Sequence, residues 1–384
     1  MDRYDTHIRN LLEQEVVGSG VSPCASAGFA VFRAGCWWTA SAAAGRRAGE
    51  AAAMDTVYDL ASVSKSFVAA SVARKVRLGA LSFESPLGAL LPEVATAPAA
   101  ARSLELLLSH RAGLLAHVPL FDVLQTGGAV RRRGLLQRAA SSLRPGCNGP
   151  APALGFPALY SDLGYLLAGE ALACTQGEAL DQVVHQEVSQ PLGIDVGSAR
   201  QWLASNARFI ARVAPSEHVG FRGGLLRGVV HDENAWALAG HGLAGQAGLF
   251  GTVWDVLSFG RALLDALRGR NEQWLRSADV QHLVAERKNG SLRLGFDGKS
   301  GPAPSAGPSA SAHSFGHLGF TGTSFWCDPV ADSVTVLLTN RVCPTRENTR
   351  IREARPRVHE ALQAWAGVLA PYIDPKGLVA RDQP

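Results

Sequence analysis

Segments with the composition of β-strands lie at both ends of this chain, and the pattern between them is mostly helical. Near the N-terminus, residues 29–32 and 36–39 flank a short glycine-containing turn, which predicts a hairpin. Near the C-terminus, residues 317–326 and 334–339 predict two strands around a turn at Asp328-Pro329. We therefore expect an α/β fold of the α+β type. Both chain ends form one antiparallel sheet with flanking helices, and a mostly helical second lobe lies across a cleft.

Helices are predicted at both termini and after the first strands. Residues 2–17 carry apolar side chains at helical spacing, and Pro356 is well placed as the first residue of the last helix. Another helix is predicted from about Ser62 to Leu78. Three segments rich in alanine, glycine or proline are predicted to be loops: 41–53, 144–157 and 298–314, the last either an ordered rim loop or disordered.

The chain has 384 residues, 47% of them apolar, which is enough for a large core. We expect a single unit over 1–384, with an α/β lobe of about 1–80 and 310–384 and a helical lobe of about 81–309. No run of eighteen apolar residues is present, so no membrane span is expected. The first residues lack the pattern of a secretory signal, so the expected location is the cytoplasm.

Cysteine spacing and charge exclude several classes of site. The six cysteines are widely spaced and form no C-x-x-C pair, which favours free buried thiols over a disulfide framework or a structural zinc site. The net charge is +4 and the basic residues are scattered, so nucleic acid is not an expected partner. Neither a metal nor another cofactor is predicted.

The segment Ser62-Val63-Ser64-Lys65 is the strongest chemical signal. A serine hydroxyl becomes a useful nucleophile only when a base takes its proton. Residues three apart on a helix share a face, so Lys65 can approach Ser62. A serine in the first helical turn also lies at the positive end of the helix dipole. A buried lysine can lose its proton near neutral pH, whereas an arginine cannot.

The same four residues have an ordinary structural interpretation. A serine that opens a helix is usually an N-cap, and a lysine one turn later is usually solvated. Two observations favour the chemical interpretation. The chain contains no other S-x-x-K, and only five of its 37 basic residues are lysines.

Three segments carry a resemblance to a known family. They are Asp59 to Phe67 around the serine, Leu78 to Leu87, and Leu107-Leu108-Ser109-His110-Arg111-Ala112-Gly113-Leu114. Together they resemble the serine β-lactamase and penicillin-binding-protein superfamily. The likeness is greatest to its class C-like branch, which also holds esterases and D-aminopeptidases. It extends from about residue 26 to 367 and implies the β-lactamase/transpeptidase-like fold.

The second motif of that family is Tyr-x-Asn, and Tyr160-Ser161-Asp162 resembles it. The resemblance implies that Tyr160 lies beside the nucleophile and relays protons. Asp162 departs from the pattern, since a carboxylate replaces an amide. This change favours a cationic or donor group at that position, either from the substrate or from Lys65.

The third motif of the family is Lys-Thr-Gly on a strand, and His317-Leu318-Gly319-Phe320 resembles its surroundings. The resemblance implies that the amides of Ser62 and Phe320 form an oxyanion hole and that His317 and Gly319 line the substrate site. Histidine and leucine supply neither a fixed cation nor a hydroxyl. We therefore expect weak or no turnover of β-lactams.

Two further segments match the same branch. His231-Asp232-Glu233-Asn234 could suggest a metal site, but adjacent side chains cannot easily converge on one ion, so a helix start is favoured. Asn340-Arg341 is expected to be structural.

The sequence thus predicts a serine hydrolase that forms a covalent acyl-enzyme on Ser62, with Lys65 and Tyr160 sharing the proton transfers. Which of the two is the base in each step stays open. An esterase acting on a small-molecule ester is the leading interpretation. A D-aminopeptidase or D,D-peptidase acting on an amide, or a weak β-lactamase, is the alternative. A non-catalytic binding protein on the same fold is the interpretation from another class. The oligomeric state is not predicted.

Overall fold

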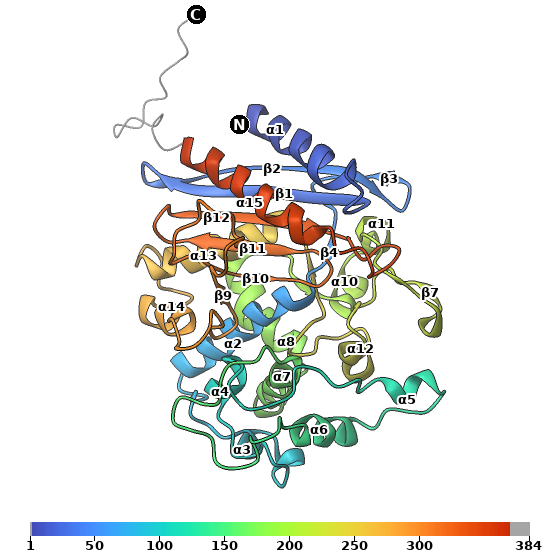
Figure 1. The fold of residues 1–384 in the computed structure, drawn as a ribbon, viewed down its shortest axis with the longest axis vertical. Coiled ribbons are helices and arrows are strands. Elements are labelled where there is room, and N and C mark those ends of the chain that lie inside the picture. Colours follow the sequence, from blue (N-terminus) through green and yellow to red (C-terminus); the bar gives the residue numbers. More distant parts are fainter. Residues whose placement is uncertain (1, 369–384) are drawn as a thin grey trace, which may run out of the picture.

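The two chain ends meet in one sheet. The computed structural model describes residues 2–368. Within them the largest sheet has seven strands in the order β3-β2-β1-β12-β11-β10-β9, and every neighbouring pair is antiparallel (Figure 1). The strands are β1 (Cys24–Arg33), β2 (Cys36–Arg47), β3 (Glu50–Ala51), β9 (Asp297–Gly298), β10 (Phe315–Leu318), β11 (Ser324–Asp328) and β12 (Ser333–Thr339). The pairing of β1 with β12 joins the two ends, so the predicted antiparallel sheet with flanking helices is confirmed.

Helices cover both faces of this sheet. α1 (Asp2–Leu12) and α15 (Ile351–Val368) lie on one face, and α13 (Val253–Leu267) packs on the other (Figure 1). The alternation along β1 explains how one strand serves two cores. Phe29 and Val31 pack with Ile8 and Val358 beneath the terminal helices, whereas Ala30 belongs to the larger core on the opposite face.

The remaining helices form the mass below the sheet in Figure 1. In chain order they are α2 (Ser64–Arg77), α3 (Leu87–Leu90), α4 (Leu104–Leu108), α5 (Asp122–Gln125), α6 (Arg132–Ser141), α7 (Asp162–Gln176), α8 (Leu180–Val184), α9 (Gln190–Leu192), α10 (Ala199–Ser205), α11 (Phe209–Arg212), α12 (Glu233–Ala239) and α14 (Ser277–Val284). A second sheet has three strands in the order β4 (Tyr58–Asp59), β8 (Leu249–Gly251) and β5 (Gly197–Ser198). A third sheet pairs β6 (His218–Val219) with β7 (Gly224–Leu225). The division into an α/β lobe and a helical lobe of about 81–309 stays a proposal; α13, which falls within 81–309, packs on the sheet.

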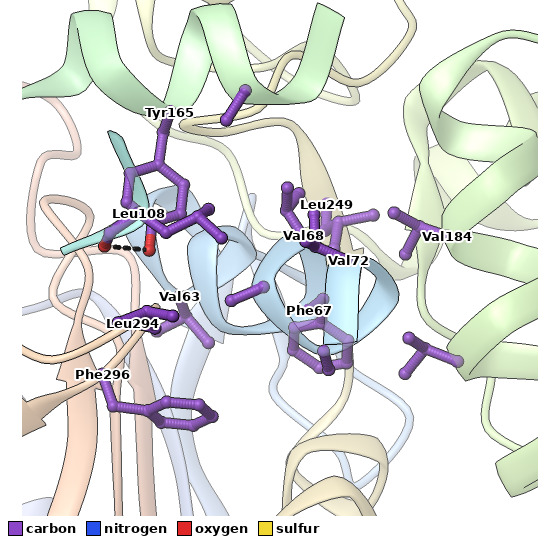
Figure 2. Close-up of a cluster of buried hydrophobic side chains, with 14 of the residues drawn as sticks. Val63, Phe67, Val68, Val72, Leu108, Tyr165, Val184, Leu249, Leu294 and Phe296 are labelled. Atoms are coloured by element: carbon purple, nitrogen blue, oxygen red, sulfur yellow. Dashed lines mark hydrogen bonds between the residues drawn. The ribbon is translucent and has the colours of Figure 1, made fainter. Parts of the chain in front are cut away.

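Helix α2 occupies the centre of the larger core. Figure 2 shows Val63, Phe67 and Val72 of this region surrounded by side chains from other elements. Tyr165 of α7 lies at its edge and donates a hydrogen bond of 2.8 Å to the carbonyl of Leu108. Because buried apolar contacts surround α2, the position of the segment that precedes it is fixed from several directions.

The structure corrects three local predictions. Residues 41–53 are not a loop, because β2 continues to Arg47 and β3 follows; small alanine side chains there allow α1 to pack closely on β2. Residues 317–326 are not one strand, because β10 ends at Leu318 and the segment turns at two glycines before β11 begins. Pro356 lies inside α15 and does not begin it.

Other expectations have mixed outcomes. The loop 298–314 is ordered, since Lys299 Nζ donates to the carbonyls of Pro308 at 2.6 Å and Ala310 at 2.5 Å. All six cysteines are free thiols, but two of them, Cys36 and Cys174, are exposed. No helix between residues 2 and 368 combines the length and apolar character needed to cross a membrane.

The stacked rings of Phe67 and Phe259 provide a test of the core around α2. Their centroids lie 4.0 Å apart and both side chains are fully buried. We expect Phe67→Ala to lower the free energy of unfolding by about 3–5 kcal/mol, because it removes buried area and leaves a cavity. Urea denaturation measures the change. Leu78→Ala is the control, since Leu78 is 61% exposed next to the same helix and should change stability by less than about 0.5 kcal/mol.

Candidate active site

The backbone before Ser62 is held in an unusual conformation. Ser62 lies in the short 3₁₀ turn Ala61–Val63 that leads into α2. Ala61 has a φ of 47°, in the left-handed region that costs energy for a residue other than glycine. The buried carboxylate of Asp59 accepts hydrogen bonds from the amides of Ala61 at 2.8 Å and His231 at 2.7 Å. This carboxylate holds the backbone that presents the Ser62 hydroxyl.

Two threonines join the same backbone to the turn between β10 and β11. Thr321 Oγ1 donates to the carbonyl of Asp59 at 2.8 Å, and Thr323 Oγ1 donates to the carbonyl of Leu60 at 2.9 Å. The segment that carries Ser62 and the turn that carries Phe320 therefore form one hydrogen-bonded unit.

Lys65 is fully buried and its ammonium contacts three oxygens. Nζ lies 2.9 Å from Ser62 Oγ, 2.8 Å from Asp162 Oδ1 and 3.1 Å from the carbonyl of Gln246. Burial is the largest single influence and lowers the pKa of Lys65, but Asp162 and Tyr160 together outweigh it, so the pKa is raised. The Lys65 side chain is consequently an ammonium that donates to the Ser62 hydroxyl.

Tyr160 lies beside this ammonium. Lys65 Nζ is 5.0 Å from the centre of the Tyr160 ring, and the ring stacks on His110 with centroids 4.7 Å apart. Burial raises the pKa of Tyr160, while Lys65 and Ser62 oppose the shift in part. The Ser161 amide donates to Nδ1 of His110 at 2.9 Å, which assigns the proton of that ring to Nε2. Tyr160 is thus a neutral phenol on a fixed aromatic support.

The N-terminus of α7 positions Asp162. Ser161 is the N-cap, and Asp162 is the first residue of the helix, where the dipole favours a negative charge. The loop that brings the Gln246 carbonyl to Lys65 passes very close to α7. A Cβ at Gly245 would lie 1.8 Å from the Tyr165 carbonyl oxygen, so only glycine permits this approach.

The strand β10 and the turn after it contribute His317, Gly319 and Phe320. Burial, and then the charge of Lys65, lowers the pKa of His317 to about 3, so its ring is neutral at neutral pH. The ring of Phe320 is 49% exposed, and it stacks on His231 with centroids 5.6 Å apart.

These residues surround one cavity of about 740 Å³. Six of the seven residues predicted from sequence line it: Ser62, Tyr160, Asp162, His317, Gly319 and Phe320. The seventh, Lys65, is fully buried and contacts the cavity through Ser62. Within residues 2–368 no group of histidine, cysteine, aspartate or glutamate side chains has a geometry suited to a metal ion.

Several residues around the cavity were not predicted as part of it. His110 supports Tyr160, although its segment was noted only for its family resemblance. Asp232 is the N-cap of α12, which confirms the predicted helix start, but it also lines the cavity. Burial and the nearby Asp162 raise the pKa of Asp232. Arg341 and Arg355 also line the cavity; Arg341 was expected only to be structural, and nothing in the local sequence distinguishes Arg355 from the other arginines.

Comparison with known proteins identifies similar chains. The model of the family described as Beta-lactamase matches residues 8–359. A protein of Escherichia coli K12 named "Putative D-alanyl-D-alanine carboxypeptidase" is 26% identical over 74% of this chain and 69% of its own length. Relatives of the same name from Escherichia coli O157:H7 and Salmonella strains are matched over only about 45% of their length.

Solved structures share the fold. EstCE1, described as a hydrolase with promiscuous acyltransferase activity, is 21% identical with a TM-score of 0.65, over 93% of this chain and 99% of that one. An octameric penicillin-binding protein homologue from Pyrococcus abyssi is 15% identical with a TM-score of 0.66, over 95% of this chain and 77% of that one.

The charge state of Lys65 can be measured directly. Asp162 raises the pKa of the Lys65 ammonium, so Asp162→Asn removes a stabilising negative charge and should lower that pKa. Carbon-13 NMR of the lysine Cε groups as a function of pH reports the titration. The chain has only five lysines, and Lys65→Arg identifies the signal.

Asp297→Asn serves as the control, because Asp297 lines the same cavity without an ion pair to Lys65. An unchanged Lys65 titration in Asp162→Asn would contradict the assignment of Asp162 as the main electrostatic partner.

Proposed function

Because this chain belongs to the beta-lactamase family, we propose that it is a serine hydrolase that forms an acyl-enzyme on Ser62 and acts as an esterase on small carbonyl substrates. The observation that carries this proposal is the 2.9 Å contact between Lys65 Nζ and Ser62 Oγ at the wall of a cavity. A serine hydroxyl in contact with a buried amine fits a nucleophile with its proton acceptor or electrostatic partner.

In the proposed acylation, Ser62 Oγ attacks the substrate carbonyl carbon and its proton passes to the group formed by Lys65 and Tyr160. The amides of Ser62 and Phe320 stabilise the tetrahedral oxyanion. When the intermediate collapses, the C–O bond to the alcohol breaks and the leaving alkoxide takes a proton from the same group. Water then attacks the acyl carbon, and the acid leaves Ser62 with its proton restored.

The resting charges limit the roles of Lys65 and Tyr160. Lys65 is a buried ammonium and Tyr160 a neutral phenol, since the pKa values of both are raised. The ammonium stabilises negative charge that develops on Ser62 Oγ. Proton acceptance requires that one of the two groups first lose a proton, so the rate should rise with pH whichever group is the base.

An uncharged ester fits the cavity better than a penicillin. The neutral ring of His317 stands where the family motif has a lysine, so this strand supplies no fixed cation for a substrate carboxylate. The nearby Arg346 is already paired with Glu217 and Glu233, and the guanidinium groups of Arg341 and Arg355 donate to backbone carbonyls of the turn 319–323. We therefore propose that β-lactams are at most weak substrates.

A D-amino-acid amide or peptide is the second candidate substrate class. Asp162 and Asp232 both line the cavity, and Asp162 is paired with Lys65. Asp232 is therefore the carboxylate that is not paired with Lys65 and that a substrate ammonium can approach. The names of the curated relatives favour a peptidase as well. Activity on D-aminoacyl amides but not on simple esters would select this candidate.

The nucleophile can be identified by intact-protein mass. A fluorophosphonate probe should add one adduct to the wild-type chain and none to Ser62→Ala, while Ser71→Ala, in the helix α2 that follows Ser62, should label normally. Stable labelling by penicillin as well would favour the peptidase. Absence of labelling in a folded wild-type sample would contradict the hydrolase proposal and favour the binding protein.

Kinetics test the proton-handling residues. We expect Lys65→Met and Tyr160→Phe each to lower kcat/KM for a p-nitrophenyl ester by about 10²–10⁴-fold, because each removes a proton-transfer group. Both variants should remain folded by circular dichroism. A change of less than about threefold in either variant would exclude that residue from the proposed mechanism.

A further inference from the structure

The turn that carries Phe320 is short and has little intrinsic rigidity. Residues 319–323 connect β10 to β11, with glycine at positions 319 and 322, and Gly322 has a φ of 97°. The Phe320 ring at its tip is 49% exposed. A useful oxyanion donor has to be fixed before the reaction, so something outside the turn must hold this backbone in place.

Arg355 holds both ends of the turn. It comes from α15, which packs on β1 and β12, and it is only 6% exposed. Its Nη2 donates to the carbonyls of Gly319 and Thr323, at 3.2 Å each. The Gly319 amide also donates to the Thr323 carbonyl at 2.7 Å, so the guanidinium closes the base of the turn from outside.

Arg341 holds the middle of the turn. It follows β12, and its Nε donates to the Phe320 carbonyl at 2.8 Å while its amide donates to the Thr321 carbonyl at 3.0 Å. Its guanidinium also lies 4.4 Å from the centre of the Phe320 ring. Arg341 is itself anchored, since Nη1 donates to the carbonyls of Arg346 and Asn348 at 2.8 Å each.

Neither guanidinium has a carboxylate partner within 4.0 Å among residues 2–368, whereas Arg346 beside them has two. Burial, and then the charge of Arg341, lowers the pKa of Arg355 to about 10. Two partly desolvated like charges without a counter-ion reduce stability. Such a local cost next to a proposed reactive site indicates a role in that site.

We propose that Arg341 and Arg355 are positioning residues for the proposed hydrolysis. Their guanidinium groups fix the turn 319–323 so that the Phe320 amide faces the oxyanion, and they place positive charge beside the turn. This inference rests on the proposed function, because it requires that the Phe320 amide stabilise an oxyanion formed by attack of Ser62.

The experiment compares an oxygen ester with the matching thionoester, in which sulfur replaces the carbonyl oxygen. Sulfur is a weak hydrogen-bond acceptor, so the oxyanion donors favour the oxygen ester. The rate ratio, kcat for the oxygen ester divided by kcat for the thionoester, therefore reports on those donors. We expect Arg355→Met to lower kcat for the oxygen ester about tenfold with little change in KM, and to lower the rate ratio. Arg355→Lys, which keeps the charge, should recover part of the loss.

Arg350→Met is the matched control. Arg350 lies just before α15, and its Nη1 donates to the Ser19 carbonyl at 3.0 Å, away from the turn. Arg350→Met removes one positive charge near the start of α15, as Arg355→Met does, and it should leave the rate ratio unchanged. If Arg355→Met does not fold, Arg341→Met replaces it, and a lowered ratio is again expected.

Two outcomes overturn the inference. One is an unchanged rate ratio in a folded Arg355→Met or Arg341→Met variant, and the other is an equal fall in the ratio in Arg350→Met. Failure of the proposed function would look different, because the wild-type chain would then neither hydrolyse the oxygen ester nor label at Ser62. Hydrolysis that depends on Ser62, together with an unchanged ratio in the variants, would reject the role of the arginines alone.

Discussion

The buried ammonium of Lys65 determines how the parts around it must be arranged. A charged amine without solvent contact requires several oxygen partners at hydrogen-bond distance, or its burial would cost several kcal/mol. The partners are Ser62 Oγ, the Asp162 carboxylate and the Gln246 carbonyl, which come from three separate parts of the chain. The start of α2, the N-terminus of α7 and the loop before β8 therefore have to converge on one point. The close approach at Gly245 is a direct consequence.

The carboxylate at position 162 gives this chain a different electrostatic balance from the Tyr-x-Asn pattern that it resembles. An asparagine would accept a hydrogen bond from Lys65 without a full negative charge, whereas Asp162 raises the pKa of the ammonium. As a result, the Lys65 ammonium is firmly held between Asp162 and Ser62. In the proposed mechanism, Lys65 is then a weaker proton acceptor at rest, which gives more weight to Tyr160 and its support by His110.

The sequence predicted those features that depend on local patterns. Strand-like segments at both ends predicted the sheet, and the spacing of Ser62 and Lys65 on one helix face predicted their contact. Predictions failed where tertiary packing overrides local composition. Alanine-rich residues after position 40 suggest a loop, yet they extend β2 because α1 requires small side chains there. Pro356 suggests a helix start, yet α15 begins earlier and tolerates it in its interior.

The arginines around Phe320 illustrate a kind of information that composition conceals. The chain uses arginine for most of its positive charges, so Arg355 looks like an ordinary surface residue in the sequence, and Arg341 was expected only to be structural. Their position becomes meaningful only when β10, β12 and α15 bring them behind one turn. The family motif that His317 departs from places a lysine on the strand itself. Here the strand side chain is neutral, and the positive charges come from Arg341 and Arg355 at the cavity wall, where they are bonded to carbonyls of the turn. In the proposed mechanism these charges stabilise an oxyanion bound by the Phe320 amide, and their bonds to the turn carbonyls leave fewer donors for a substrate carboxylate, as the proposed esterase activity on neutral substrates requires.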